Sequence, residues 1–423
     1  MAEIKKILIA NRGEIVQRAI RTIKEMGKKS VAVYSAGDKN ASYLKHADEA
    51  VCIGGAKSSE SYLNIPALIT AAEMTGCDAI FPGYGFLSEN QDFVEICKLH
   101  NIKFIGPSSE VMEKMADKSK AKEEMVRAGV PVVPGSKGAV RTLDEGKKIA
   151  REIGYPIMAK ASAGGGGRGM RLIKEEKDFD SQYLAASSEA LAAFGDGTMY
   201  LERFINNPRH IEVQVIGDSH GNAIHIGERD CSLQRRHQKV IEESPAILLN
   251  DETRAKLHEV AVKATKYLKY EGAGTFEFLA DDKQNIYFME MNTRLQVEHP
   301  VSEMVSGLDI IEWMIKVAEG EKLPPQESIR FRGHAIECRI TAEDPNNFLP
   351  CPGKITQWMV PGGRNVRVDS HIYTNYIVPP YYDSMIGKLI VWGRDREKAI
   401  NIMKRALSEF EVEGIKTNIP FHK

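Results

Sequence analysis

The stretch Glu290-Met291-Asn292-Thr293-Arg294-Leu295-Gln296-Val297-Glu298-His299-Pro300 carries polar side chains at every second position. In an extended backbone, alternate side chains share one face. That face would carry in order a carboxylate, an amide, a guanidinium, an amide and a carboxylate, from Glu290, Asn292, Arg294, Gln296 and Glu298. This order is explained if the row contains a metal ligand, a side chain that binds an anion, and a base. The alternative is a solvated strand face, because exposed strands usually carry polar residues too.

Glu277 lies between two phenylalanines in an apolar predicted strand. A carboxylate in such surroundings is normally avoided unless it is paired or bound to a metal ion. A short turn after this strand would return the chain so that Glu290 lies close to Glu277, with Asn292 beyond it. Two carboxylates and an amide oxygen suit Mg²⁺, which prefers oxygen ligands. The alternative is an internal ion pair of Glu277 with Lys239 or Arg294.

The sequence Gly164-Gly165-Gly166-Gly167-Arg168-Gly169 satisfies the pattern G-x-G-x-x-G. A dinucleotide-binding loop of this pattern needs a strand before it and a helix after it. This loop lies between two predicted strands, at residues 156–161 and 170–173, which favours a flexible flap that closes over nucleotide phosphates. Lys160 and Lys118 are placed to bind phosphate oxygens as point charges. The alternatives are a mobile surface loop and solvated lysines.

Residues 228–239, Glu-Arg-Asp-Cys-Ser-Leu-Gln-Arg-Arg-His-Gln-Lys, concentrate basic side chains in one short run. This run indicates an anion site. A nucleic-acid patch is the alternative, but interleaved aromatic residues and a surrounding basic domain are missing. His210 fits either a core histidine or a nucleotide contact.

The bulk composition is that of a soluble globular protein, with 423 residues, 43% hydrophobic and 27% charged residues, and a net charge of −1. This balance gives no strong field that would recruit nucleic acid or anionic lipid. Six scattered cysteines without a Cys-x-x-Cys pair indicate reduced thiols and a cytoplasmic protein. The N-terminus does not have the pattern of a signal peptide, and no apolar run approaches the roughly 20 residues that span a bilayer.

Strands alternate with helices over roughly the first 115 residues, which predicts a Rossmann-like parallel sheet. A linker follows at residues 129–135, then a compact α+β segment to about residue 205. The remainder is rich in strands and includes a long helix near residues 251–270. It ends with an amphipathic helix at 395–410.

The chain resembles biotin carboxylase, an ATP-grasp enzyme, over essentially its whole length. The resemblance rests on motifs in matching order: Ile9-Ala10-Asn11-Arg12-Gly13-Glu14-Ile15, His46-Ala47-Asp48-Glu49-Ala50, Pro82-Gly83-Tyr84-Gly85-Phe86-Leu87-Ser88-Glu89-Asn90, Lys160-Ala161-Ser162 with the glycine loop, Pro208-Arg209-His210-Ile211-Glu212, residues 228–239 and 290–300, Glu337-Cys338-Arg339-Ile340 and Tyr381-Tyr382-Asp383-Ser384-Met385.

The resemblance implies a role for each matching residue. ATP would be contacted by Lys118, Lys160, Gly165, Gly166, Gly167, Glu202, His210, Gln234 and His237. Mg²⁺ or Mn²⁺ would be held by Glu277, Glu290 and Asn292. Bicarbonate would be bound by Lys239, Arg294, Gln296, Val297 and Glu298, and biotin by Tyr84 and Arg339. Glu298 would be the general base, with Lys239, Arg294 and Arg339 as its catalytic cations.

The implied reaction is the first half-reaction of a biotin-dependent carboxylase, such as acetyl-CoA carboxylase of fatty acid biosynthesis or pyruvate carboxylase. Bicarbonate attacks the γ-phosphate of ATP to give carboxyphosphate, and biotin on a carrier protein then takes up the carboxyl group. No Ala-Met-Lys-Met attachment motif is found, so the carrier is another polypeptide or a missing domain. The implied partners are a biotin carboxyl carrier protein, a carboxyltransferase subunit and a second copy in a homodimer, with neither nucleic acid nor membrane.

We therefore expect an α/β protein with a Rossmann-like N-terminal domain (1–115), an ATP-grasp lid carrying the flap (130–205) and an α+β C-terminal ATP-grasp and biotin carboxylase region (206–423). Two departures from relatives are noted. Ala163 stands where many have another glycine, which would stiffen the flap. Relatives also usually continue beyond the position of Lys423, with a segment that helps close the adenine side.

Three other functions compete with this interpretation. The nearest is a different ATP-grasp enzyme, either a carboxylate–amine ligase or a carbamoyl-phosphate-forming domain. A nucleotide-binding regulatory subunit without catalysis would not need the full set of acid, amide and guanidinium groups at 277–298. An NAD-dependent oxidoreductase is disfavoured because the first strand–helix turn, Asn11-Arg12-Gly13-Glu14, has no G-x-G-x-x-G pattern.

Overall fold

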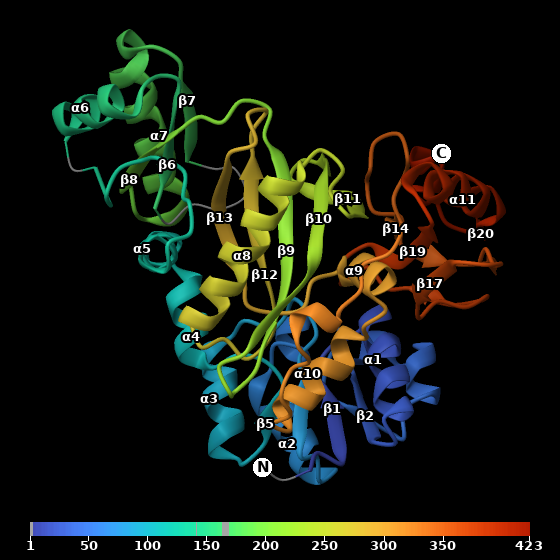
Figure 1. The fold of residues 1–423 in the computed structure, drawn as a ribbon. Helices are drawn as coiled ribbons and strands as arrows, with labels where there is room; N and C mark the ends of the chain where they lie inside the picture. Colours follow the sequence, from blue (N-terminus) through green and yellow to red (C-terminus); the bar gives the residue numbers. More distant parts are fainter. Residues whose placement is uncertain (1–2, 141, 163–168) are drawn as a thin grey trace. The chain divides into compact units, whose positions relative to one another are not determined.

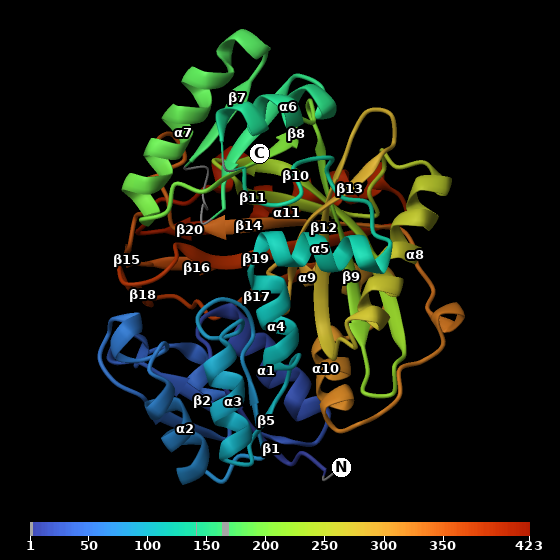
Figure 2. The ribbon, with the colours of Figure 1, turned by 90° about the vertical axis from the view of Figure 1, so that its left-hand side faces the viewer.

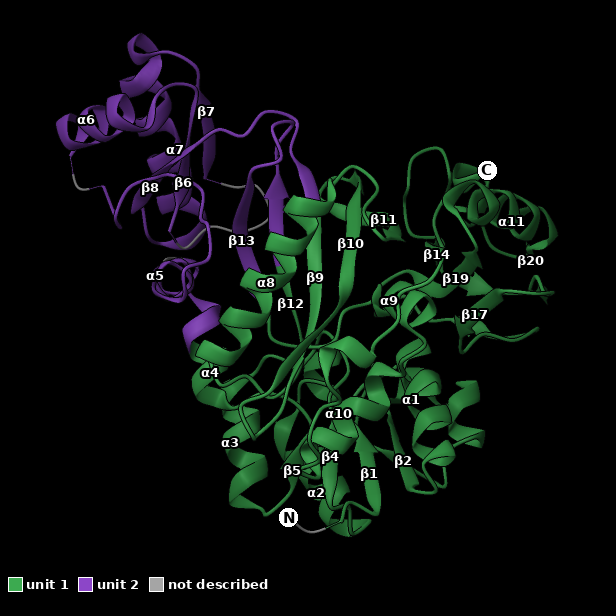
Figure 3. Ribbon diagram, viewed as in Figure 1, with its two compact units in different colours: residues 1–113, 211–276, 292–423 green, residues 114–210, 277–291 purple. Residues whose placement is uncertain are grey.

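The computed structural model describes residues 3–140, 142–162 and 169–423 (Figure 1). The chain divides into two compact units (Figure 3). Unit 1 comprises residues 1–113, 211–276 and 292–423, and unit 2 comprises residues 114–210 and 277–291. The glycine flap at 163–168, which includes Gly165, Gly166 and Gly167, lies outside the described residues.

Unit 1 begins with a five-stranded parallel sheet, as the alternation of strands and helices predicts. Its strands, in the spatial order β3-β2-β1-β4-β5, are β3 (Glu49–Cys52), β2 (Lys29–Tyr34), β1 (Lys6–Ile9), β4 (Ala79–Phe81) and β5 (Lys103–Phe104). The helices between them are α1 (Glu14–Glu25), α2 (Ile65–Met74) and α3 (Gln91–Leu99), and α4 (Ser109–Ala116) follows β5. The strand order reverses at β1, where doubly wound folds place their ligand sites at the carboxyl ends of strands.

The alternation of side chains along β1 gives this sheet two apolar faces. The ribbon in Figure 2 shows the sheet together with helices α1, α2 and α3. Ile7 and Ile9 belong to one buried cluster with Ile15 and Ile20 of α1. Leu8 belongs to a second cluster that contains buried residues of α2 and α3. The first βα turn, at Asn11 to Glu14, therefore lies between two well-packed layers.

The larger sheet of unit 1 has the order β12-β9-β10-β11-β14-β19-β17. Its strands are β9 (Arg209–Gly217), β10 (Ala223–Arg235), β11 (Gln238–Ser244), β12 (Gly272–Ala280), β14 (His334–Thr341), β17 (Val366–Ser370) and β19 (Met385–Gly393). The accompanying helices are α8 (Asp251–Tyr267), α9 (His299–Ser306), α10 (Ile310–Ala318), α11 (Arg396–Glu409) and α12 (Ile419–His422). Short pairs are formed by β15 (Gly353–Lys354) with β18 (Ile377–Val378), and by β16 (Gln357–Met359) with β20 (Glu411–Glu413).

Unit 2 contains a three-stranded antiparallel sheet in the order β7-β6-β8. It is built from β6 (Ile157–Ala161), β7 (Met170–Ile173) and β8 (Met199–Arg203), with α5 (Lys118–Ala128), α6 (Leu143–Ile153) and α7 (Phe179–Phe194). Phe179 and Tyr183 of α7 stack at a centroid distance of 5.4 Å in its core. The predicted α+β segment is confirmed. The last part of β12 and most of β13 (Ile286–Asn292) also belong to unit 2.

The prediction that residues 290–298 form one extended strand is wrong. Strand β13 ends at Asn292, and the chain then bends and turns until α9 begins at His299. The main-chain N–H of Thr293 donates to Glu89 rather than to a neighbouring strand. Pro300 occupies the first turn of α9, a position that suits proline because its missing N–H is not needed there. The polar side chains after Asn292 are therefore directed by a loop.

Candidate active site

Glu298 lies at the amino end of α9 and is bound by cations from two other elements. Its Oε1 lies 2.7 Å from Nζ of Lys239 on β11, and its Oε2 accepts a 2.9 Å hydrogen bond from Arg339 on β14. Glu298 is 2% exposed. Burial alone would raise the pKa of its carboxyl, but the neighbouring cations outweigh burial and hold that pKa well below its usual value. The carboxylate is therefore ionised and already oriented.

Two further carboxylates bind the same two cations. Glu212 lies 2.5 Å from Lys239, and Oε1 of Glu242 accepts a 2.6 Å hydrogen bond from Arg339. Both glutamates are completely buried. Burial raises the pKa of Glu242 to about 7, against the opposing charge of Arg339. Two cations thus bridge three carboxylates, an arrangement that fixes every side chain in the row.

Arg294 is held by an acid that the sequence did not predict. Its Nε donates to Glu89 at 2.8 Å, and its Nη2 donates to Oδ1 of Asn292 at 2.9 Å. Glu89 also accepts from both the main chain and the hydroxyl of Thr293. The only signal in the sequence was the position of Glu89 within the motif at residues 82–90.

Gln296 is oriented by Arg229, whose guanidinium is 0% exposed. Nη2 of Arg229 donates to Oε1 of Gln296 at 2.8 Å, and Nε donates to Glu212 at 2.5 Å. The remaining hydrogen bonds of this guanidinium go to Gln214, Thr275 and Ser302. Arg229 therefore supports one predicted site residue, Gln296, together with Glu212, which binds Lys239.

Two basic residues of the run 228–239 have different surroundings. Arg229 is buried, whereas the guanidinium of Arg235 lies 3.7 Å above the ring of Phe348. The pairing of β10 with β11 shifts register between Asp230 and Gln234, and Arg236 and His237 form the turn to β11 with positive φ angles of 48° and 66°. Gln234 is paired with Lys239 across the two strands and donates to the carbonyl of Cys231.

Tyr84 is held near the first βα turn of unit 1. Its hydroxyl donates to Glu14, while Nδ2 of Asn11 donates to the carbonyls of Tyr84 and Pro82 at 2.8 and 2.7 Å. The chain passes through Gly83 with φ of +65°, where an added Cβ would lie 3.0 Å from Asn11. The motif Asn11-Arg12-Gly13-Glu14 thus fixes Tyr84.

Val297 is the remaining residue of unit 1 that was predicted to contact bicarbonate. Its carbonyl oxygen accepts a hydrogen bond from Lys388.

In unit 2, Glu202 on β8 is bound by two lysines. Its Oε2 accepts from Lys160 on β6 at 2.6 Å, and its Oε1 accepts from Lys122 on α5 at 3.0 Å. Burial would raise the pKa of Glu202, but the two ammonium groups lower it overall. Sequence analysis predicted Lys160 and Glu202 and missed Lys122, which no motif distinguishes from the other lysines of its helix.

Glu277 and Glu290 lie on the neighbouring strands β12 and β13, joined by a turn in which Asn285 donates to Asp281. Oε2 of Glu277 lies 3.0 Å from Nε2 of His210, and Oε2 of Glu290 lies 3.3 Å from Nζ of Lys118. The contact of Glu277 with His210 is an internal pair of the kind that the alternative interpretation expected, formed with a different partner. Two carboxylates on neighbouring strands fit a divalent ion bound together with phosphate oxygens.

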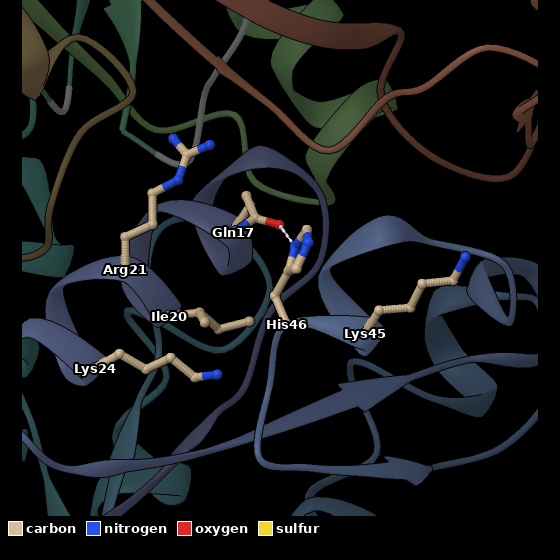
Figure 4. Close-up of a pocket in the computed structure, with 6 residues that line it drawn as sticks. All are labelled: Gln17, Ile20, Arg21, Lys24, Lys45 and His46. Carbon is tan, nitrogen blue, oxygen red and sulfur yellow. Dashed lines mark hydrogen bonds between the residues drawn. The ribbon is translucent and has the colours of Figure 1, made fainter.

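Two general features complete the description. A pocket of about 380 Å³ is lined by Gln17, Ile20, Arg21, Lys24, Lys45 and His46 (Figure 4), none of them a predicted site residue. Within the described residues, no helix is long and apolar enough to cross a bilayer.

Comparisons with known proteins match the whole length of the chain. Residues 3–112 match the family model described as biotin carboxylase, N-terminal domain, and residues 337–423 match the biotin carboxylase C-terminal domain. Residues 117–326 match the model described as carbamoyl-phosphate synthase L chain, ATP binding domain. A biotin carboxylase from Nostoc sp. is 57% identical over 420 residues, covering 99% of this chain and 94% of the relative. The chain belongs to the biotin carboxylase family.

Solved structures of biotin carboxylases agree with this assignment. A biotin carboxylase–β,γ-ATP complex from Campylobacter jejuni is 69% identical with a TM-score of 0.94, covering 99% of this chain and 94% of that one. The biotin carboxylase domain dimer of 2-oxoglutarate carboxylase from Hydrogenobacter thermophilus, in complex with MgADP, ADP and bicarbonate, is 51% identical with a TM-score of 0.91, covering 99% and 93%. The expected α/β fold, with a parallel N-terminal sheet and ATP-grasp domains, is confirmed.

Proposed function

We propose that this protein carboxylates biotin on a carrier protein, using ATP and bicarbonate, through carboxyphosphate. The observation that carries the proposal is the ionised, buried Glu298 held between Lys239 and Arg339. A base fixed among cations suits a substrate that is itself an anion and must lose a proton before it can attack. The activity of family members supports the same reaction.

In the first step, Glu298 takes the proton of bicarbonate while a bicarbonate oxygen attacks the γ-phosphorus of ATP. The bond from that phosphorus to the bridging oxygen breaks, and ADP leaves. Lys239 and Arg294 hold the bicarbonate anion beside the negative phosphates, with Gln296 and Val297 completing its contacts. Arg294 suits a planar anion because its guanidinium can donate two parallel hydrogen bonds.

In the second step, the bond between the carboxyl carbon and the phosphate oxygen of carboxyphosphate breaks, the ureido nitrogen of biotin takes the carboxyl group, and the proton of that nitrogen leaves with the released inorganic phosphate. Tyr84 and Arg339 are the residues we assign to biotin. Arg339 would stabilise the negative charge that develops on the ureido oxygen. Its two contacts with Glu242 and Glu298 already orient the guanidinium.

We assign ATP to Lys118, Lys160, Glu202, His210, Gln234 and His237 together with the glycines of the flap. Glu277, Glu290 and Asn292 would hold Mg²⁺ or Mn²⁺, which supplies positive charge between phosphate oxygens when bound. Lys160 and Lys118 each lie beside a carboxylate, Glu202 and Glu290 respectively. Phosphate oxygens would compete with these carboxylates for the same ammonium groups.

We further propose that the partners are a biotin carboxyl carrier protein, a carboxyltransferase subunit and a second copy of this chain. The dimeric relative from Hydrogenobacter supports the homodimer. All six cysteines are free, which supports a reducing, cytoplasmic location. The division at 1–115, 130–205 and 206–423 also stays a proposal, supported in part by the family-model boundaries at 112 and 117.

The test is ATP cleavage by the purified protein with and without bicarbonate, and with and without free biotin. We expect cleavage to require bicarbonate and Mg²⁺ and to increase with biotin. Cleavage that depends on an amine in place of bicarbonate would instead establish a carboxylate–amine ligase. Formation of carbamoyl phosphate from ammonia would establish the other alternative, and no turnover under any condition would favour a regulatory nucleotide-binding subunit.

A further inference from the structure

Lys388 is a charged residue in the interior of unit 1. It lies in the middle of β19 and is 0% exposed. Burying an ammonium group is costly unless it is both paired and hydrogen-bonded. Sequence analysis assigned no role to this residue, and the reaction steps above do not use it.

The ammonium of Lys388 contacts one carboxyl group and one main-chain carbonyl. It lies 3.1 Å from Oε1 of Glu14 and donates a 2.8 Å hydrogen bond to the carbonyl oxygen of Val297. Burial alone would lower the pKa of Lys388, but Glu14 and Glu337 outweigh burial and raise it overall. Lys388 therefore stays charged and keeps its hydrogen to donate.

The position of Lys388 in the sheet places it beside the proposed catalytic group. Lys388 is paired directly with Arg339 across β14 and β19, so their side chains leave the same face of the sheet. Arg339 binds the side chain of Glu298, while Lys388 binds the carbonyl of the preceding residue. Two adjacent cations thus hold two successive residues of one turn.

The Val297 carbonyl belongs to the same planar peptide group as the N–H of Glu298. A hydrogen bond to that oxygen fixes the plane, and with it the start of the Glu298 side chain. On the other side of Lys388, Glu14 accepts the hydroxyl of Tyr84. One buried lysine therefore connects the turn assigned to bicarbonate with the residue assigned to biotin.

We propose that Lys388 is a positioning residue that fixes the Val297–Glu298 peptide for bicarbonate and links it through Glu14 to Tyr84. This inference rests on the proposed function. Lys388 touches neither substrate, and it acts by holding the turn from which the base projects. A displacement of about 1 Å at such a position can lower a rate or an affinity by about 100-fold.

The test compares Lys388→Met with the double variant Lys388→Met/Glu14→Gln. The single variant leaves the carboxylate of Glu14 buried without its cation and is expected to be unstable. The double variant removes both charges and still lacks the donor to Val297. In the folded double variant we expect the KM for bicarbonate to rise about tenfold or more, while the KM for ATP changes by less than about twofold.

Lys28→Met is the matched control, because Lys28 likewise binds one carboxylate, Glu319 at 2.6 Å, and one carbonyl, Ile4 at 2.7 Å. Lys28 lies on no element that carries a predicted site residue, so both KM values should stay at the wild-type level. Glu14→Gln alone keeps the bond to Val297 and should change the bicarbonate KM much less than the double variant does.

An unchanged bicarbonate KM in the folded double variant would overturn the role of Lys388. So would an equal effect from Glu14→Gln alone, or a parallel rise in the KM for ATP. Wild-type protein that cleaves ATP without any need for bicarbonate would instead overturn the proposed function and this role with it. The two failures are therefore distinguished by the wild-type assay.

Discussion

The Lys239 ammonium lies 2.7 Å from Oε1 of Glu298, a carboxylate with almost no exposure to solvent. The same ammonium lies 2.5 Å from Glu212. Ligand atoms of Glu212, Cys231 and Glu298 lie within 4.8 Å of one another, a grouping that could hold a metal ion. Lys239 already supplies the positive charge between the two carboxylates, so we assign this cluster to the proton transfer and the divalent ion to Glu277 and Glu290.

Replacing Glu298 by Gln should abolish most of the bicarbonate-dependent ATP cleavage. Gln is nearly isosteric but cannot take the proton, and loss of a general base typically costs about two to four orders of magnitude in rate. ATP binding, measured by calorimetry, should be unaffected. Glu228→Gln is the control, because Glu228 is also a buried carboxylate bound by two basic side chains, Arg254 and His258. Cleavage by E298Q at near the wild-type rate would remove Glu298 from the mechanism.

Glu242→Gln should make the stability of the folded protein less sensitive to rising pH. Burial raises the pKa of Glu242 from 4.5 to about 7 in the folded protein. The folded carboxyl then keeps its proton to a higher pH than the unfolded one, so the wild type loses stability as pH rises from about 4.5 to 7. The variant lacks this loss. In urea unfolding, the free energy of unfolding of the variant should rise relative to that of the wild type between pH 5 and pH 7.5. The same difference between the two proteins at both pH values would contradict the raised pKa of Glu242.

Glu290→Lys should abolish ATP cleavage and leave the fold intact. The variant places a second ammonium beside Lys118, which lies 3.3 Å from Glu290, and removes a carboxylate assigned to the metal. Binding of Mn²⁺ with ADP, followed by electron paramagnetic resonance, should weaken, while circular dichroism should match wild type. Glu271→Lys, at a partly exposed ion pair with Lys103 at 3.8 Å, is the control for adding charge. Turnover by E290K at the wild-type rate would show that the metal assignment is wrong.

Glu202→Gln should destabilise unit 2, because its two lysines would then lack their shared carboxylate. The loss of a partly buried, hydrogen-bonded charge of this kind costs about 1–3 kcal/mol. Since Glu202 has a lowered pKa, the stability that it contributes is present above the unfolded pKa and is lost as pH falls through the folded pKa. The difference between variant and wild type should therefore shrink in acid. Urea unfolding at pH 7 and pH 3.5 measures the difference in free energy of unfolding between the variant and the wild type. An equal difference at both pH values would show that the ion pairs of Glu202 do not stabilise unit 2.

Sequence patterns predicted most of the fold because its elements follow local rules. The helix over Glu14–Glu25 has buried Ile15, Ala19 and Ile20 at helical spacing and ends before Gly27, which has φ of +71°. Its parallel sheet follows from the alternation of strands and helices. The extension of β13 through residue 298 failed because alternation of polar residues does not distinguish a strand from a loop whose side chains are fixed by distant partners.

The residues that support the proposed site residues could not be found from the sequence. Glu89 is 205 residues from Arg294, and Lys388 is 91 residues from Val297. No local spacing connects such pairs, because only the tertiary fold brings them together. The partners of the run at 228–239 are likewise distant in the sequence, because Arg229 binds Glu212 and Arg235 lies over the ring of Phe348.

The hydrogen bonds of the buried Arg229 guanidinium restrict which amino-acid substitutions this chain can accept during evolution. Its guanidinium is bound by five side chains, from Glu212, Gln214, Thr275, Gln296 and Ser302. Replacing any one of them leaves a buried donor without an acceptor, and replacing Arg229 leaves several acceptors without a donor. These six positions are thus expected to vary together or not at all, so drift at the proposed bicarbonate contact Gln296 is restrained by residues that no substrate reaches.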